Sequence, residues 1–521
     1  MRSTAALLIV LASGDVSLSV AQQPTAPPPE LDAYVASVLA AFEVPGAAVT
    51  IVKDGQVVLA KGYGARALGR PDPVDARTLF GIASNTKAFT ATALGMLVED
   101  GRLEWDVPVI EYLPWFRMSD PYVTSELTVR DLLVHRSGLG LGAGDLLWWP
   151  ASTYDRREIA RRLRYLPFAT SFRSAYAYDN VLYLIAGEVI EAVSGSTWEE
   201  FVSERILDVI GMTCSNVLHS AAGMGGNVAA THARVDGTVR AIAPFLSDNT
   251  NPAGGINACA DDMGRWMIVQ LDSGRVGDHR LFRPATTREL WSLVTPMPIG
   301  TPPPELAPLH THFNGYALGF RVNDYRGRKL VSHTGGLPGY VSKVAMIPEL
   351  RLGVSVLTNQ ESGAAFEAIT YHILDFYLDA PTHDWLAAYR HVTERSARRI
   401  TTTEQGTAAE RDTTSRPSLP LGRYAGGYTD RWYGDVAILL EGDGLVIDFR
   451  QTPSLVGDLH HWQYDTFVAR WRDRALRADA FVTFMLGPEG RIERVRMEAV
   501  SPATDFSFDF HDLDLRPVRH P

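Results

Sequence analysis

Ser84 and Lys87 have the residue types and the spacing of a nucleophile and its activator. They stand in the run Gly-Ile-Ala-Ser-Asn-Thr-Lys at positions 81–87, where an apolar stretch begins. Side chains three residues apart share one face of a helix, and a serine at a helix N-terminus has free backbone N–H groups near its developing oxyanion. A lysine that is desolvated by apolar neighbours can lose its proton and act as a base. On its own, the pair also fits a helix-capping serine followed by an exposed lysine.

Two further elements contain side chains suited to the same chemistry. Tyr178 and Asn180 form a Tyr-x-Asn element, and a His-Thr-Gly-Gly element at positions 333–336 follows a strand-like run. Each of these elements alone is more typical of an ordinary loop or turn. The presence of all three elements in this order predicts a catalytic site.

The three elements together resemble the penicillin-recognising serine hydrolases, which include class C β-lactamases, DD-peptidases, D-aminopeptidases and related esterases. The resemblance covers about residues 32–380, and three further stretches agree with it: Leu132–Leu139, Pro252–Ile256 and Leu357–Asn359. It implies an antiparallel five-stranded sheet with flanking helices and a helical lobe, with the site between the sheet and the lobe. It also implies catalysis through an acyl-enzyme.

The resemblance assigns a role to each residue of the three elements. Ser84 would attack a carbonyl, while Lys87 and Tyr178 would share the proton transfers; which of the two is the acylation base stays open. Asn180 would hydrogen-bond Lys87 and the substrate amide, and the backbone N–H groups of Ser84 and Gly336 would form the oxyanion hole. The implied substrate- and oxyanion-binding residues are Asn180, His333, Thr334, Gly335 and Gly336.

His333 is a departure that bears on the substrate. β-Lactamases carry a lysine at this position, which is charged near neutrality, whereas a histidine is mostly neutral. The sequence contains no recognisable counterpart of the deacylating glutamate of class A enzymes. Glu188 and Glu191 are predicted to lie on the solvent-facing side of a helix. We therefore expect a peptidase or amidase acting on small peptides with D- or non-standard residues. The alternatives are an esterase or β-lactamase-type hydrolase and, less favoured, a non-catalytic penicillin-binding protein.

The elements that must position these residues lie at the two ends of the first 380 residues. Two β-rich runs are separated by Asp54-Gly55, a hairpin signal, and a helix from Ser84 ends at Gly101. Strand-like runs return near the end of this part, followed by a helix at Ala364–Tyr377; these runs are Tyr316–Val322, Leu330–His333, Val341–Ile347 and Gly353–Leu357. We expect an α/β (α+β) fold in which both ends share one sheet and the middle forms a helical lobe.

Composition changes along the chain predict its division into parts. A basic start, a short apolar run and a small-x-small site indicate a signal peptide, and the last hundred residues show short alternating runs typical of an all-β, lipocalin-like barrel. The expected parts are a signal peptide at 1–21, a spacer at 22–31, the hydrolase domain at 32–385, a linker at 386–420 and the barrel at 421–521.

The bulk composition limits the partners and the cellular location. A net charge of −11 argues against a nucleic-acid partner, and no segment is long and apolar enough for a membrane span. No metal or other cofactor is expected, because the cysteines and histidines lack ligand spacing. Cys214 and Cys259 are expected to be two buried free thiols, with a disulfide as the alternative. The expected partner is a small molecule or short peptide and the expected location is periplasmic or secreted, while a homo-oligomer is left open.

Overall fold

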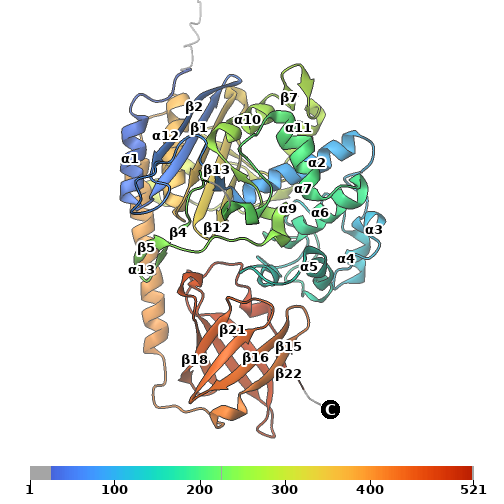
Figure 1. Ribbon diagram of the computed structural model, residues 1–521, viewed down its shortest axis with the longest axis vertical. Coiled ribbons are helices and arrows are strands. Elements are labelled where there is room, and N and C mark those ends of the chain that lie inside the picture. The colour runs from blue at the N-terminus through green and yellow to red at the C-terminus, as the bar shows by residue number, and fades with distance from the viewer. Residues whose placement is uncertain (1–24, 224–225, 519–521) are drawn as a thin grey trace, which may run out of the picture.

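The computed structural model describes residues 25–223 and 226–518. The predicted signal peptide at 1–21 lies outside the described residues. Figure 1 shows two domains that are connected along one side by the long helix α13 (Trp385–Ala409). The first domain combines a sheet with helices, and the second is a β-barrel.

Among the described residues, the first domain is built on an eight-stranded sheet with the order β2-β1-β14-β13-β12-β11-β10-β9. Every neighbouring pair in this sheet is antiparallel. Its strands are β1 (Gly46–Lys53), β2 (Gln56–Gly64), β9 (Thr295–Pro296), β10 (Asn314–Tyr316), β11 (Arg321–Tyr325), β12 (Arg328–Leu337), β13 (Tyr340–Ile347) and β14 (Leu352–Thr358). Because β1 lies between β2 and β14, both ends of the domain meet in one sheet, as the sequence predicts.

The expectation of five strands is wrong in its number. The five longest strands, β1, β2, β12, β13 and β14, correspond to the expected sheet, and the short strands β9, β10 and β11 extend it. These three strands contain two to five residues each. Such short runs are held by pairing with a neighbouring strand rather than by a hydrophobic alternation of their own, which leaves little signal in the sequence.

Helices cover both faces of the sheet, so its central strands β1 and β14 are buried along their whole length. β1 is buried at all eight positions, which is the pattern of a strand enclosed on both sides. The turn after it has positive φ at Asp54 (53°) and Gly55 (79°), as a two-residue type I′ hairpin requires. The helices α1 (Leu31–Ala41) and α12 (Gly363–Tyr377) belong to the hydrophobic cluster on one face.

The opposite face supports the helical lobe. Helix α10 (Ala260–Leu271) packs on β1 and β14, and α2 (Thr86–Glu99) is buried around nearly its whole circumference, as expected for a helix inside a domain. The other helices of this side are α3 (Val109–Tyr112), α4 (Pro121–Glu126), α5 (Arg156–Arg162), α6 (Val181–Ser194), α7 (Trp198–Val202), α8 (Asp208–Ile210), α9 (Asn251–Gly254) and α11 (Pro284–Leu290). Short two-stranded pairs complete it: β3 (Phe80–Gly81) with β6 (Asn257–Ala258), β4 (His232–Val235) with β5 (Thr238–Ala241), and β7 (Arg275–Val276) with β8 (His279–Arg280).

The second domain is a nearly closed antiparallel barrel with the strand order β21-β20-β19-β18-β17-β16-β15-β22. Its strands are β15 (Gly426–Asp430), β16 (Gly434–Glu441), β17 (Gly444–Phe449), β18 (Val456–Gln463), β19 (Thr466–Trp471), β20 (Ala480–Leu486), β21 (Ile492–Ala499) and β22 (Arg516–Pro517). A bridge between Val495 and Leu515 connects β21 with the segment that leads into β22. This contact brings the two ends of the barrel sheet together.

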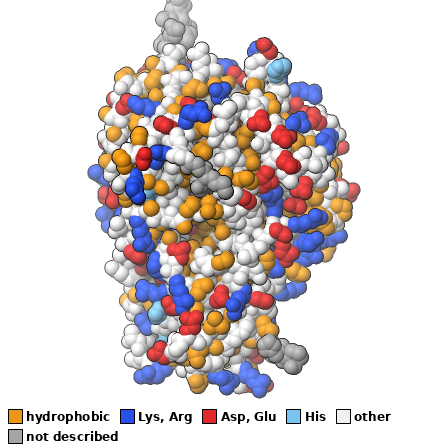
Figure 2. All heavy atoms as spheres, in the orientation of Figure 1, with side chains coloured by type: hydrophobic (Ala, Val, Ile, Leu, Met, Phe, Trp, Pro, Cys, Tyr) orange, Lys and Arg blue, Asp and Glu red, His pale blue; other side chains and the backbone are white. Residues whose placement is uncertain are grey.

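Much of the expected linker is helical. Helix α13 has buried side chains only near its start, at Trp385, Ala388 and Tyr389, and its remaining turns are polar, which is typical of a helix that bridges domains through solvent. No helix in residues 25–223 and 226–518 is both long and apolar enough to cross a membrane. On the face shown in Figure 2, acidic and basic side chains are interspersed over both domains.

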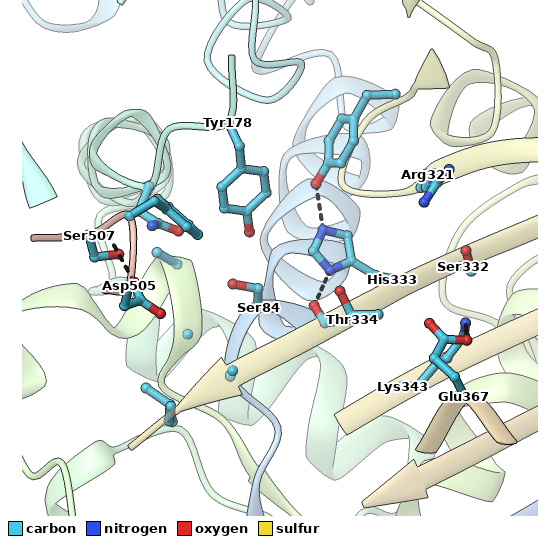
Figure 3. Close-up of a pocket in the computed structure, with 18 of the residues that line it drawn as sticks. Ser84, Tyr178, Arg321, Ser332, His333, Thr334, Lys343, Glu367, Asp505 and Ser507 are labelled. Carbon is cyan, nitrogen blue, oxygen red and sulfur yellow. Dashed lines mark hydrogen bonds and ion pairs between the residues drawn. The ribbon is translucent and has the colours of Figure 1, made fainter. Parts of the chain in front are cut away.

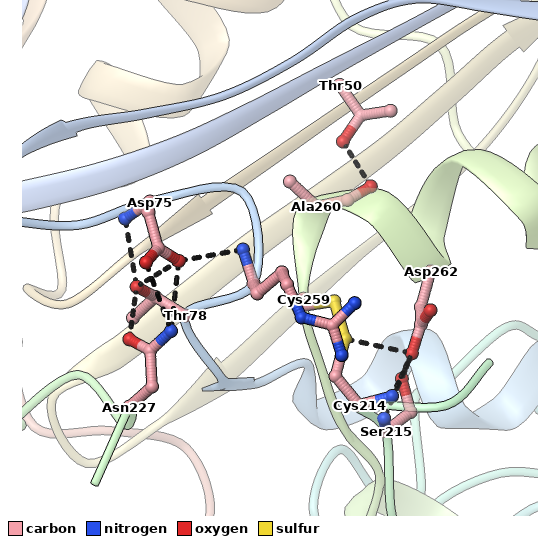
Figure 4. The surroundings of a disulfide bond; sticks show 10 residues. Thr50, Asp75, Thr78, Cys214, Ser215, Asn227, Cys259, Ala260 and Asp262 are labelled. Atoms are coloured by element: carbon pink, nitrogen blue, oxygen red, sulfur yellow. Dashed lines mark hydrogen bonds between the residues drawn. A yellow bond between two sulfur atoms is a disulfide. The ribbon is translucent and has the colours of Figure 1, made fainter.

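The expectation of two free thiols is wrong, because Cys214 and Cys259 form a disulfide (Figure 4). The two residues are 45 positions apart in sequence, and their Cα atoms lie 6.4 Å apart. Asp262 fixes the segment next to the bond, since its Oδ2 accepts hydrogen bonds from the backbone N–H groups of Cys214 and Ser215, both at 2.9 Å. The folded chain thus brings together two cysteines whose pairing has no local sequence signal.

Candidate active site

The residues of the three sequence elements come from different structural elements and meet in one place. Ser84 lies in the 3₁₀ turn Ala83–Asn85 that leads into α2, and Lys87 lies in the first turn of α2. Tyr178 and Asn180 immediately precede α6, and His333–Gly336 lie on β12. Figure 3 shows Ser84, Tyr178 and His333 around a common space.

Lys87 is fully buried and makes three polar contacts. Its Nζ lies 3.1 Å from Ser84 Oγ, 2.7 Å from Asn180 Oδ1 and 3.0 Å from the carbonyl oxygen of Ala253. A neutral amine would donate to the last two oxygens and accept a hydrogen bond from the Ser84 hydroxyl. The geometry therefore suits an amine that takes up the proton of Ser84.

Burial lowers the pKa of Lys87 to about 7, because a charged amine is costly in an apolar interior. The carboxyl groups of Asp145 and Asp179 act in the opposite direction and favour the protonated amine. Burial also raises the pKa of each of these two carboxyl groups to about 7. A cluster of groups with shifted pKa values next to a cavity is typical of a functional site.

Tyr178 directs its hydroxyl group toward Ser84 (Figure 3). The Nζ atom of Lys87 lies 5.0 Å from the centre of the Tyr178 ring. Burial raises the pKa of Tyr178 well above its usual value, while a hydrogen bond with Ser84 lowers it. Tyr178 is therefore a neutral phenol near neutral pH, able to give a proton and to receive one in return.

His333 is held as a neutral imidazole. Its Nδ1 lies 2.6 Å from the backbone carbonyl oxygen of Thr334, so Nδ1 carries the proton, and the hydroxyl of Tyr316 donates to Nε2 at 2.6 Å. Burial, with a smaller contribution from the charge of Lys87, lowers the pKa of His333 to about 3. The positive charge that a lysine would bring to this position is thus absent at neutral pH.

Gly335 and Gly336 differ in the space around them. A Cβ atom on Gly335 would lie 2.2 Å from the carbonyl oxygen of Ile82 and 2.6 Å from Ser342 Oγ, whereas one on Gly336 would meet nothing within 4 Å. Gly335 thus allows β12 to approach the turn that carries Ser84. Gly336 and the exposed Thr334 line the cavity instead.

The sequence motifs do not identify Asp145, Asp179 or His135, which are fully buried beside the site. Nδ2 of Asn180 donates to Asp145 Oδ2 at 2.8 Å, and the ring centre of His135 lies 4.3 Å from that of Tyr178. Two of them could have been found from their positions in the sequence. His135 lies in the Leu132–Leu139 stretch that resembles the family, and Asp179 lies between Tyr178 and Asn180. Asp145 has no comparable motif around it.

The cavity has a volume of about 490 Å³ and is lined by both domains. The size is within the range of small-molecule sites. Trp148 and Trp149 line it from the helical lobe, and Asp505, Phe506 and Ser507 line it from the barrel. The contribution of the barrel is not indicated by any of the catalytic motifs.

Comparison with known proteins identifies a family for each domain. A family model described as "Beta-lactamase" matches residues 31–378, and one described as "Domain of unknown function (DUF3471)" matches residues 410–517. A curated relative, unguisins hydrolase ungD' of Aspergillus campestris, is 29% identical over 416 residues, which cover 76% of this chain and 75% of the relative. The second domain is matched by the second of these family models.

Solved structures show the same fold. The octameric penicillin-binding protein homologue from Pyrococcus abyssi has a TM-score of 0.60 and 22% identity, covering 93% of this chain and 99% of that chain. D-amino acid amidase from Ochrobactrum anthropi, complexed with D-phenylalanine, has a TM-score of 0.53 and 21% identity, covering 67% of this chain and 98% of that chain. With a family model that matches well over half of its length, the chain belongs to the β-lactamase family and is a hydrolase of that family.

Proposed function

We propose that this protein is a serine hydrolase that forms an acyl-enzyme on Ser84 and cleaves amide bonds in small peptides with D- or non-standard residues. The observation that carries the proposal is the 3.1 Å contact between Ser84 Oγ and the amine of Lys87, whose pKa is lowered to about 7 by burial. A base with this pKa is partly free at neutral pH and can take the serine proton during attack.

The proposed mechanism uses Lys87 for acylation and Tyr178 for the leaving group. Ser84 Oγ attacks the amide carbon as its proton passes to Lys87, and the backbone N–H groups of Ser84 and Gly336 bind the oxyanion. Tyr178 is the proton donor to the leaving amine because its raised pKa keeps it protonated. Water then gives a proton back to Tyr178 while its hydroxide attacks the acyl carbon. As the bond from that carbon to Ser84 Oγ breaks, Lys87 returns its proton to Oγ and both residues regain their starting states.

Two charged side chains at the cavity favour a peptide substrate. Arg321 and Asp505 both line the cavity and lie on opposite sides of Ser84 (Figure 3). Within the described part of the chain, neither residue takes part in an ion pair that would neutralise its charge, although other arginines and aspartates do. A short peptide with a free amine and a free carboxylate would match this separation of charge.

The neutral His333 argues for this class over β-lactams, whose carboxylate is served by a lysine at this position. The name of a D-amino acid amidase among the similar structures agrees with hydrolysis of amide bonds, and that of an unguisins hydrolase agrees with hydrolysis. The Cys214–Cys259 disulfide supports an oxidising compartment, so a periplasmic or secreted location remains part of the proposal. Assembly into a homo-oligomer also remains a proposal.

The test combines covalent labelling with a substrate panel. A fluorophosphonate is expected to add one phosphonyl group to the wild type and none to Ser84→Ala, while Ser174→Ala, which changes an exposed serine of the loop before Tyr178, is labelled as the wild type. Peptides and p-nitroanilides of D-amino acids should be hydrolysed faster than their L-counterparts and than nitrocefin. Fast turnover of p-nitrophenyl esters with no turnover of any amide would reject the peptidase assignment.

A further inference from the structure

A loop of the C-terminal barrel enters the wall of the catalytic cavity. The loop follows β21 and presents Asp505, Phe506 and Ser507 to the cavity. The ring centre of Phe506 lies 6.1 Å from that of Tyr178. The loop is therefore adjacent to the reacting groups of the first domain.

Ser507 connects this loop to Lys87 through two further side chains. Its Oγ donates to Asp145 Oδ2 at 2.9 Å, the same oxygen accepts Nδ2 of Asn180 at 2.8 Å, and Asn180 Oδ1 accepts from Lys87 Nζ at 2.7 Å. Ser507 is 4% exposed and Asp145 is completely buried. A hydrogen bond to a carboxylate in such surroundings is stronger than the same bond in water.

Asp509 holds the backbone on both sides of Asp145. Its Oδ2 accepts the N–H of Gly144 at 2.7 Å and its Oδ1 accepts the N–H of Leu146 at 3.0 Å. The first domain alone supplies Asp145 with Trp148 Nε1 at 3.0 Å and with Asn180. Two residues of the barrel thus fix the side chain and the main chain of one carboxylate.

We propose that Ser507 and Asp509 are positioning residues for catalysis, through which the barrel holds Asp145 and thereby orients Asn180 against the amine of Lys87. This inference rests on the proposed function, because it matters for catalysis only if Lys87 acts on Ser84. On this view, the barrel completes the catalytic site instead of simply covering it.

The arrangement also affects the proton affinity of Lys87, in a direction that can be derived. The negative charge of Asp145 favours the protonated amine, and the hydrogen bond from Ser507 favours the ionised form of Asp145. Removal of the Ser507 hydroxyl therefore raises the pKa of Asp145 and lowers that of Lys87. The titratable groups facing Lys87 are those of Asp145, Asp179, His135, His333, Tyr178 and Tyr183.

The first readout is the titration of Lys87 itself in the full-length protein. The chain has five lysines, so ¹³C NMR of protein labelled at lysine Cε resolves few signals, and the signal lost in Lys87→Arg is that of Lys87. In Asp145→Asn its titration midpoint should fall by on the order of one pH unit. Ser507→Ala should shift the midpoint in the same direction by a smaller amount.

The matched control is Ser501→Ala, which removes an exposed hydroxyl of the same loop that donates to Glu404. It should leave the Lys87 midpoint and the labelling rate at their wild-type values. Ser507→Thr keeps a donor at position 507 and should restore the wild-type midpoint. Thermal unfolding of each variant shows whether it is folded at the temperature of measurement.

The second readout is the pH dependence of fluorophosphonate labelling. Ser507→Ala should react roughly tenfold more slowly at the plateau, with its acidic limb displaced to lower pH along with the Lys87 midpoint. An unchanged midpoint in folded Ser507→Ala would overturn the inference, even if the rate falls. Absence of labelling in the wild type would reject the proposed function instead, while the NMR titration would still decide whether the barrel acts on Lys87.

Discussion

Lys87 is the residue on which the electrostatics of the site converge. Among the described residues it has no ion pair in direct contact, and the three polar groups that it contacts there are a hydroxyl, an amide oxygen and a backbone carbonyl oxygen. These groups stabilise an ammonium less than a carboxylate in contact would. Asp145 and Asp179 contribute at a greater distance and keep the pKa from falling further.

The pH dependence of acylation should follow Lys87 and not His333. The rate should rise with pH through the Lys87 pKa of about 7, because the protonated amine cannot accept the serine proton. The pKa of His333, about 3, lies below this window, so His333→Gln should leave the midpoint of the acidic limb in place. His333→Lys should move that midpoint to lower pH, because a second cation disfavours protonation of Lys87.

Stopped-flow labelling with a fluorophosphonate between pH 5 and 9 measures the acidic limb of the rate profile for each variant. The control is His279→Gln, which changes an exposed histidine on β8. A midpoint that shifts equally in His333→Gln and His333→Lys would show that His333 titrates with Lys87.

At this scale, the sequence predicts the residues that belong to motifs and little else. Ser84, Lys87, Tyr178 and His333 can be found because their types recur at set spacings. Asp145 cannot be found in this way, since it is one of 60 acidic residues and its partner Ser507 is 362 positions away. Its role follows only from the folded contacts between two domains.

Among the elements, β12 has the arrangement that a substrate-binding strand needs. Its first half, Arg328–Ser332, pairs with β11, whereas the segment His333–Leu337 pairs only with β13. One edge of that segment is therefore free of a strand partner in the part of the chain that the structure describes. Backbone groups at a free strand edge are available to an extended peptide.

Substitution of Gly335 should separate β12 from the turn of Ser84. Gly335→Ala places a methyl group against the backbone oxygen of Ile82, and overpacking of this kind costs about 1–3 kcal/mol. We expect a lower free energy of unfolding and slower labelling of Ser84. The matched variant Gly336→Ala meets no atom within 4 Å and should unfold like the wild type. Urea titration measures both, and equal stability of the two variants would contradict the prediction.

The number of strands shows what sequence patterns miss at the level of elements. The runs that became β1, β13 and β14 are long and apolar, and the sequence predicts them as strands. β9 and β10 contain two and three residues, too few for an alternation to be recognised. Likewise, the polar composition of residues 386–420 suggests a linker, although arginine, glutamate and alanine in that stretch also favour the helix α13.

At the scale of the whole molecule, the barrel is docked on the helical lobe by backbone-directed contacts. The hydroxyl of Tyr154 donates to the carbonyl oxygen of Tyr433 at 2.6 Å, and Arg162 donates to that of Trp432 at 3.0 Å. Buried apolar residues of the lobe and the barrel belong to one continuous cluster. The sequence predicts two domains in this order, but not their contact, because docking depends on the shapes of two folded surfaces.

Gly142 offers a direct test of this docking. It has φ of 70°, and a Cβ atom there would lie 2.7 Å from both the ring and the carbonyl oxygen of Phe506. Gly142→Val should therefore push the barrel loop away and uncouple the two domains. Calorimetry should show one unfolding transition for the wild type and two for this variant. Labelling of Ser84 should also be slower, because Ser507 no longer holds Asp145.

The control is Gly195→Val. Gly195 has a similar φ of 82°, but a Cβ atom there would have no atom within 4 Å among the described residues, so this variant adds backbone strain of about 1–3 kcal/mol without a clash. It should lower the temperature of a single transition, and the same single transition in Gly142→Val would show that docking does not depend on this contact.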